Sequence, residues 1–151
     1  MKWKIAIGAL LAIIVLIQFL YSKLPETAPP DNKDLFVTGK VPDDIKTIIS
    51  RSCYDCHSMQ SRYPWYSHVA PVKWAIRNDI KGGRTAVNFS AWGNLEKKDK
   101  IKILGDISDV IKEKEMPVPM YLIMHKDAKL STGERDKLIA WADAASESYF
   151  H

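Results

Sequence analysis

The five residues Cys53-Tyr54-Asp55-Cys56-His57 constrain this chain more than any other stretch of its 151 residues. Two thiols stand two residues apart, and a histidine follows the second thiol at once. This C-x-x-C-H pattern is typical of a covalent attachment site for a c-type haem. In such a site Cys53 and Cys56 form thioether bonds to one porphyrin, and the adjacent imidazole of His57 binds the iron as its proximal ligand.

The cysteine pair has three other interpretations. A structural zinc site needs four ligands and usually a second pair, but the chain has only these two cysteines. A thioredoxin-like dithiol starts a helix after a strand, and no strand-rich βαβ pattern is visible. A plain disulfide also remains open. We favour one covalently attached haem c with its iron, because only that interpretation gives His57 a role.

The N-terminus carries an apolar run over residues 5–21, which is preceded by Lys2 and Lys4 and broken only by Gln18. Such a run is a signal peptide or a membrane anchor. No small-x-small cleavage site follows it, so we expect an uncleaved, single-pass transmembrane helix within residues 1–24. A buried core helix would leave the two lysines unexplained.

The charge distribution predicts the topology and excludes one class of partner. By the positive-inside bias, Lys2 and Lys4 keep the N-terminus in the cytoplasm and send the rest of the chain to the periplasmic or extracytoplasmic side of the cytoplasmic membrane. Covalent haem attachment in bacteria takes place on that side. The net charge is +4, and most of it comes from lysines around the apolar run. The remainder is nearly neutral, which argues against a nucleic-acid partner.

The rest of the chain divides into a tether over residues 25–41, rich in proline, and a haem domain over residues 42–151. Apolar residues at helical spacing predict about four helices in this domain. They run from residue 42 to the motif, from about residue 70 to Gly82-Gly83, from 96 to 115, and from a capping box at 131–134 to about 149. No period-2 strand is visible. The fold class is therefore all-α, a cytochrome c-like domain around one covalent haem.

The second axial ligand of the iron separates electron transfer from ligand binding or catalysis. Met116 is our first candidate, because the proline that follows it ends a predicted helix and holds an extended segment. The alternatives are Met120 and Met124 in the same segment, and His68 or His125 in a bis-histidine site. A methionine at these positions can also be a gap filler in the core.

Bulky and polar residues after the motif are candidates for the walls of a haem pocket. Aromatic rings could enclose the porphyrin, and arginine, amide or hydroxyl groups could bind its propionates. Ordinary core and surface roles remain equally open for each of them. The set comprises Tyr63, Trp65, Tyr66, Arg84 and Trp92, together with Arg62, Asn88 and Phe89.

These residues resemble a known family, the bacterial haem-binding domain proteins, over about residues 42–141. The resemblance rests on the motif itself, on Arg62-Tyr63-Pro64-Trp65-Tyr66, Ala70-Pro71, Gly83-Arg84, Asn88-Phe89-Ser90, Met116-Pro117, Tyr121, Met124-His125 and Ala128-Lys129-Leu130-Ser131. It implies a monohaem c-type domain with Cys53 and Cys56 as anchors, His57 as proximal ligand and Met116 as distal ligand. The family pattern often has a second proline directly after Met-Pro, whereas Val118 intervenes here.

Three functions follow from these features. The first is a membrane-tethered single-electron carrier with an unidentified redox protein as its partner. The second is a haem-based sensor or small-ligand-binding domain with an open or labile sixth position. The third is an enzyme such as a peroxidase, for which His125 or His68 would have to supply the acid/base group. We expect a carrier rather than an enzyme.

Overall fold

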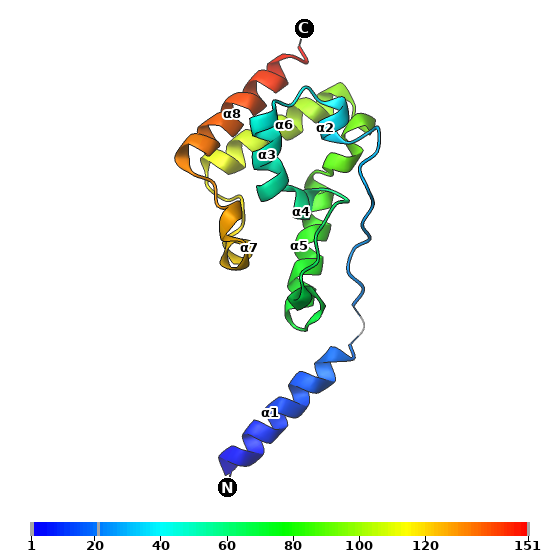
Figure 1. The fold of residues 1–151 in the computed structure, drawn as a ribbon, viewed down its shortest axis with the longest axis vertical. Helices are drawn as coiled ribbons and strands as arrows, with labels where there is room; N and C mark the ends of the chain where they lie inside the picture. Colours follow the sequence, from blue (N-terminus) through cyan, green and yellow to red (C-terminus); the bar gives the residue numbers. More distant parts are fainter. Residues whose placement is uncertain (1, 21, 151) are drawn as a thin grey trace.

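A computed structural model describes residues 2–20 and 22–150 of the chain, and this described part is helical without any strand (Figure 1). The all-α prediction is thus confirmed. The α-helices are α1 (Lys2–Gln18), α2 (Leu35–Thr38), α3 (Asp43–Ser52), α4 (Tyr54–His57), α5 (Val72–Ala86), α6 (Lys97–Lys112), α7 (Pro119–Met124) and α8 (Thr132–Glu147). The 3₁₀ helices are η1 (Trp65–His68), η2 (Phe89–Asn94) and η3 (Lys126–Ala128).

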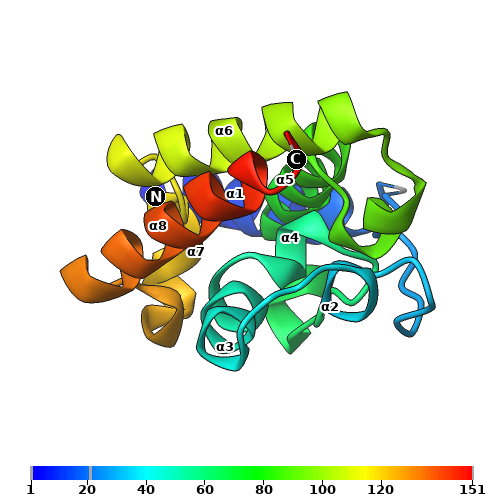
Figure 2. The same ribbon diagram turned by 90° about the horizontal axis from the view of Figure 1, so that it is seen from above.

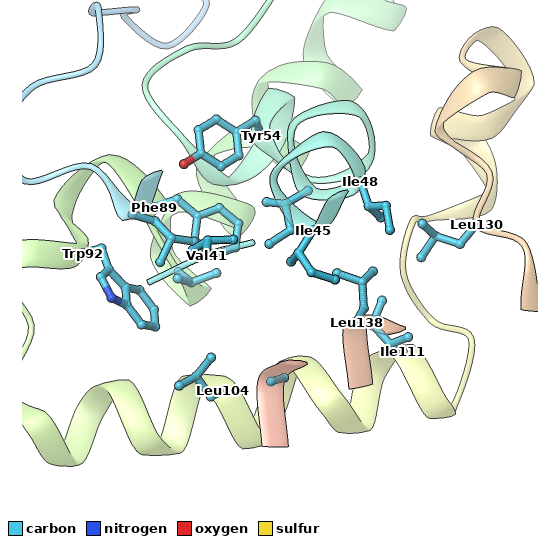
Figure 3. Close-up of a cluster of buried hydrophobic side chains, with 14 residues drawn as sticks. Val41, Ile45, Ile48, Tyr54, Phe89, Trp92, Leu104, Ile111, Leu130 and Leu138 are labelled. Carbon is cyan, nitrogen blue, oxygen red and sulfur yellow. The ribbon is translucent and has the colours of Figure 1, made fainter. Parts of the chain in front are cut away.

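The core forms where α3 lies across the pair of long helices α6 and α8, which run side by side in both views (Figures 1 and 2). Leu104 of α6 and Ala142 of α8 are fully buried between them, and Leu138 is 2% exposed. Ile45 of α3 points into the same cluster (Figure 3). Each such aliphatic side chain contributes about 1.5–3 kcal/mol on burial, so these contacts hold α3, and with it the motif, in place.

Residues 25–41, which we expected to form an extended tether, pack against the domain instead. Leu35 of α2 is 1% exposed and belongs to the core cluster. Further upstream, the carbonyl of Pro25 accepts a hydrogen bond from the Tyr63 hydroxyl at 2.6 Å, and that of Glu26 accepts one from Arg84 at 2.8 Å. Residues 25–28, which we call the strap, therefore lie along the loop that follows the motif.

Helix α1 comprises 17 residues, and none of them is buried. Among the described residues, no helix combines the length and the apolar character that crossing a membrane requires. The transmembrane helix expected within residues 1–24 is therefore not found. Helix α1 ends at Gln18, before the end of the apolar run at residue 21 of the sequence.

Two helix ends differ from the sequence prediction. Helix α5 continues through Gly82 and Gly83 to Ala86, so the glycine pair does not stop it. Helix α6 ends at Lys112, before the expected residue 115. It ends there because Lys114 adopts the left-handed conformation with φ of 61°, and the amide of Glu115 donates back to Val110 at 3.0 Å. This pairing is the Schellman arrangement of a helix C-terminus.

The start of α8 agrees with the prediction. The Ser131 hydroxyl accepts from the amide of Glu134, and the Glu134 carboxylate accepts from the amide of Ser131. This reciprocal pair is the predicted capping box, which satisfies two amides that the first turn of a helix leaves without partners. Glu134 also forms an ion pair with Arg51 of α3 at 2.7 Å. The capping box therefore connects α8 to the helix that leads into the motif.

Candidate haem site

The C-x-x-C-H motif forms a single turn directly after α3. The amide of Cys53 donates to Ile49 and ends α3, and the amides of Cys56 and His57 both donate to the Cys53 carbonyl at 3.2 and 3.0 Å. This turn is α4. Because one helical turn brings residues three and four apart to the same side, Cys53, Cys56 and His57 face one region. Both cysteines are free thiols.

Gly83 explains why α5 passes so close to the motif. A Cβ atom at this position would lie 2.6 Å from the carbonyl oxygen of Cys56 and 3.0 Å from its carbonyl carbon. Only glycine allows the two backbones to approach to this distance. A Cβ at the neighbouring Gly82 would meet nothing within 4 Å. Gly83 is therefore a contact residue for the motif rather than a helix stop.

The imidazole of His57 is oriented by a backbone carbonyl. Its Nδ1 lies 3.3 Å from the oxygen of Val87, just after α5. An Nδ1–H that donates to this carbonyl leaves Nε2 unprotonated, which is the form that binds a metal. Burial lowers the pKa of His57, partly opposed by hydrogen bonds to the backbone at Val87 and Gly83. The neutral ligand form is thus favoured at neutral pH.

The two thiols lack the features of a reactive dithiol or a zinc site. Burial raises the pKa of Cys53 to about 12 and that of Cys56 to about 11, with further raising by a neighbouring thiol or carboxylate. A reactive cysteine has a lowered pKa instead. Within the described residues, no group of three or more histidine, cysteine, aspartate or glutamate side chains is placed to hold a metal ion. The raised pKa values of the two thiols argue against a reactive dithiol.

Two cavities adjoin the motif. One, of about 150 Å³, lies among apolar side chains of α3, α6 and α8, and the other, of about 260 Å³, lies between α5 and the segment that follows α6. The apolar walls of the first include Ile49, Phe89, Ile103, Ile107, Val110 and Leu138. Ser52, Cys53, His57 and Met116 line both. Two thiols, an imidazole nitrogen, a thioether and apolar walls are the donor set and surroundings that a covalent haem requires.

Met116 is the only one of the proposed distal ligands that lines either cavity. It is half-buried against the core, and its carbonyl lies 3.4 Å from the guanidinium of Arg135. Met120 and Met124 of α7 are 73% and 59% exposed, and His68 is exposed on η1. His125 is hydrogen-bonded through Nε2 to the hydroxyl of Tyr66 at 2.8 Å.

Of the eight proposed pocket residues, only Phe89 lines either cavity. Trp65 is 78% exposed, and Trp92 is buried on the side of the core that faces α2. Arg84 donates to the carbonyl of Ser58 at 2.8 Å, and the hydroxyls of Tyr63 and Tyr66 bind Pro25 and His125. Arg84 and Tyr63 therefore support the loop after the motif, and the role of the proposed pocket residues toward a haem stays a prediction.

Sequence reasoning missed several residues of the site. The apolar wall from α6 includes Ile103, Ile107 and Val110, and helical spacing alone does not distinguish a cavity wall from an ordinary core. Tyr121 of α7 lines the second cavity, and its hydroxyl donates to Asp55 at 2.7 Å. The sequence shows the carboxylate in the middle of the motif, which needs hydrogen-bond donors once it is buried, but it does not show which residue supplies them.

The fold and the site together define a helical, cytochrome-like haem protein. The pattern of the haem-binding domain family matches residues 12–144, so the chain belongs to this family. It is also similar to the cytochrome c peroxidase Ccp of Escherichia coli strain K12, with 26% identity over 103 residues. These residues are 66% of this chain but only 22% of that protein's length. No solved structure matches the chain.

Proposed function

We propose that this protein carries single electrons through one covalently attached haem c, with Cys53 and Cys56 as thioether anchors and His57 and Met116 as axial ligands. The observation that carries the proposal is that His57 and Met116 line the same two cavities beside the two thiols. Two filled axial positions allow the iron to change oxidation state with little rearrangement of its ligands.

When bound, the haem would supply a reversible one-electron couple, and the residues of the chain would tune it. The carbonyl of Val87 orients His57 and strengthens it as a ligand. The aliphatic residues of α3, α6 and α8 exclude water from one side of the site. A low-polarity environment and a thioether ligand both favour a higher reduction potential than that of a solvent-exposed bis-histidine site.

We further propose that α1 attaches the protein to the cytoplasmic membrane, with the haem domain on the periplasmic or extracytoplasmic side. The helix is apolar from Ile5 to Ile17, and Lys2 and Lys4 lie in its first turn. Its far end is bonded to the domain, since the Gln18 amide donates to and accepts from the backbone of Ala70 at 3.1 and 2.9 Å. A redox protein at the same membrane face would be the partner.

A second candidate function is peroxide reduction or small-ligand binding at an open sixth position. It is favoured by the name of the Escherichia coli relative, a cytochrome c peroxidase. The relation covers only 22% of that protein, so its activity is a hypothesis here. Under this alternative, Met116 would not bind the iron, and the reduced protein would bind carbon monoxide.

Optical spectra of the wild-type protein and two variants test the axial ligands. The chain is produced by export in a host that attaches haem, and haem that resists extraction by acidic acetone establishes covalent attachment. The wild type should show low-spin bands and the weak far-red sulfur-to-iron transition. Met116→Ala should lose that transition and become high-spin, whereas the exposed control Met120→Ala should keep it. A wild-type spectrum without the transition would contradict Met116 ligation and favour the second function.

The membrane attachment needs a separate test. Cells that produce the full chain are fractionated, and the membranes are washed with sodium carbonate at high pH. The wild type should stay in the washed membranes, whereas a variant with Leu11→Lys and Ile14→Lys in α1 should be released. Equal release of both proteins would contradict attachment through α1.

A further inference from the structure

Asp55, the third residue of the motif, is a buried carboxylate that accepts four hydrogen bonds. It is 8% exposed. Its Oδ1 accepts from the amide and the Nε of Arg62, both at 3.1 Å, and its Oδ2 accepts from Nη2 of Arg62 at 3.0 Å. The fourth donor is the hydroxyl of Tyr121, at 2.7 Å from Oδ2. Hydrogen bonds to a buried charged acceptor are among the stronger ones in proteins.

Tyr121 belongs to α7, which has few other ties to the rest of the molecule. None of the residues of α7 is buried, and the helix projects from the body formed by α3, α6 and α8 (Figure 1). The ring of Tyr121 stacks on His125 with centroids 4.2 Å apart. Burial and the hydrogen bond to Asp55 raise the pKa of Tyr121. The hydroxyl therefore stays protonated at neutral pH and acts as a donor.

The Tyr121–Asp55 bond joins two sides of one cavity. We call residues 53–57 with Gly83 the proximal wall, and residues 116–121 the distal segment. The cavity of about 260 Å³ has Cys53, Cys56 and His57 on the proximal wall, and Met116, Pro117, Val118 and Tyr121 on the distal segment. The bond spans 66 positions in the chain and ends on a residue of the motif itself.

We propose that the hydrogen bond from Tyr121 to Asp55 is a positioning contact, which holds the distal segment so that Met116 stays available to the haem iron. The inference rests on the proposed function, in which Met116 is the second axial ligand. Tyr121 and Asp55 are positioning residues and do not touch the iron. Without this contact the distal segment moves more freely, and an added ligand displaces Met116 more easily.

The test compares Tyr121→Phe with Tyr66→Phe in the haem-loaded full chain. Each variant removes one phenolic hydroxyl near His125, but only Tyr121 reaches the motif. Imidazole is titrated into the ferric proteins, and the loss of the sulfur-to-iron band is followed. Tyr121→Phe should bind imidazole about tenfold more tightly than the wild type, a change that a lost hydrogen bond to a charged group can cause. Tyr66→Phe should bind it as the wild type does.

Amide hydrogen exchange distinguishes a positioning role from general destabilisation. In Tyr121→Phe, exchange should become faster over residues 117–125 and remain unchanged in α6 and α8. Two outcomes overturn the inference when the wild type has the sulfur-to-iron band. In the first, Tyr121→Phe binds imidazole with the same affinity as the wild type. In the second, Tyr66→Phe gains as much imidazole affinity as Tyr121→Phe does. If the wild type lacks the band, Met116 ligation in the proposed function fails, and the inference fails with it.

Discussion

The proximal wall is fixed by backbone contacts and by the core, whereas α7, which begins within the distal segment, has no buried residue and is held mainly by side-chain hydrogen bonds. On the proximal side, Gly83 lies against the carbonyl of Cys56, and Ile49 of α3 is 2% exposed. On the distal side, α7 has no buried residue, and Tyr121 makes its bond to the motif. A carrier with this division would keep its covalently bound face rigid and leave adjustment of the second ligand to the other face.

The largest expected effect comes from a matched pair of truncations. Ile49→Ala removes a buried side chain that lines the apolar cavity, and we expect it to lower the free energy of unfolding by about 2–5 kcal/mol. Ile123→Ala changes a side chain of α7 that is 61% exposed, and we expect a change within about 0.5 kcal/mol. Guanidinium denaturation of both variants measures these values. Similar losses of stability in the two variants would contradict the difference that we expect between the core-packed α3 and the exposed α7.

Gly83→Ala tests the backbone contact of the proximal wall. The added Cβ would lie 2.6 Å from the Cys56 carbonyl oxygen, so α5 or the motif must shift. We expect a loss of stability of about 1–3 kcal/mol and a lower yield of attached haem, measured by the ratio of haem to protein absorbance. Gly82→Ala is the control, because its Cβ meets nothing; it should stabilise α5 by about 0.5–1 kcal/mol. A full haem yield in Gly83→Ala would show that the contact is dispensable.

The ion pair between Arg51 of α3 and Glu134 of α8 makes the stability of the fold sensitive to pH. Hydrogen bonds from the Ser131 backbone and from Arg51 lower the pKa of Glu134 to about 2, from 4.5. A lowered carboxyl pKa stabilises the folded state above the unfolded value, and this contribution disappears as the pH falls from about 4.5 toward 2.

Glu134→Gln should therefore cost about 0.5–2 kcal/mol at neutral pH, because it removes the charged partner of a capping box. Its difference from the wild type should shrink between pH 4.5 and pH 2. Glu113→Gln, which changes an exposed carboxylate after α6, is the control and should differ by less than about 0.5 kcal/mol. Urea denaturation over this pH range measures both. A stability difference between Glu134→Gln and the wild type that stays constant with pH would argue against a stabilising role of the charged Glu134.

The smallest effect is expected at the turn that leads to the distal segment. Lys114 has φ of 61°, a conformation that costs a residue with a Cβ roughly 1 kcal/mol relative to glycine. Lys114→Gly should raise the thermal midpoint slightly and leave the sulfur-to-iron band unchanged. Glu113→Gly, one residue earlier with φ of −76°, should give no gain. A loss of the band in Lys114→Gly would show that this turn also positions Met116.

Elements with strong local signals were predictable from the sequence. The capping box at Ser131 and Glu134 and the periodic apolar residues of α8 gave its start correctly. The motif followed from three residue types in one short stretch. In each of these cases the determining contacts lie within a few residues of one another, so spacing alone carries the information.

Features that depend on distant contacts were not predictable. Gly82-Gly83 indicated a helix stop by local rules, but α5 continues because Gly83 is needed against Cys56. The aromatic residues after the motif could be recognised as bulky, but spacing could not show that Phe89 lines a cavity and that Tyr63, Trp65, Tyr66 and Trp92 do not. The bond between Asp55 and Tyr121 joins residues 66 positions apart, and no spacing rule predicts such a pair.

The strap over residues 25–28 sets how far this domain can travel. The carbonyls of Pro25 and Glu26 and the amide of Ala28 are each bonded to the domain, the last to Met59 at 2.7 Å. A flexible linker would let the tethered domain explore a volume that grows with the length of the linker. Here residues 25–28 are bonded to the domain and do not act as a flexible linker, so they do not increase the distance that the domain can move from α1. Under the proposed electron-carrier function, a redox partner would have to approach the domain where it stands, because these bonds would keep the domain from moving far from α1.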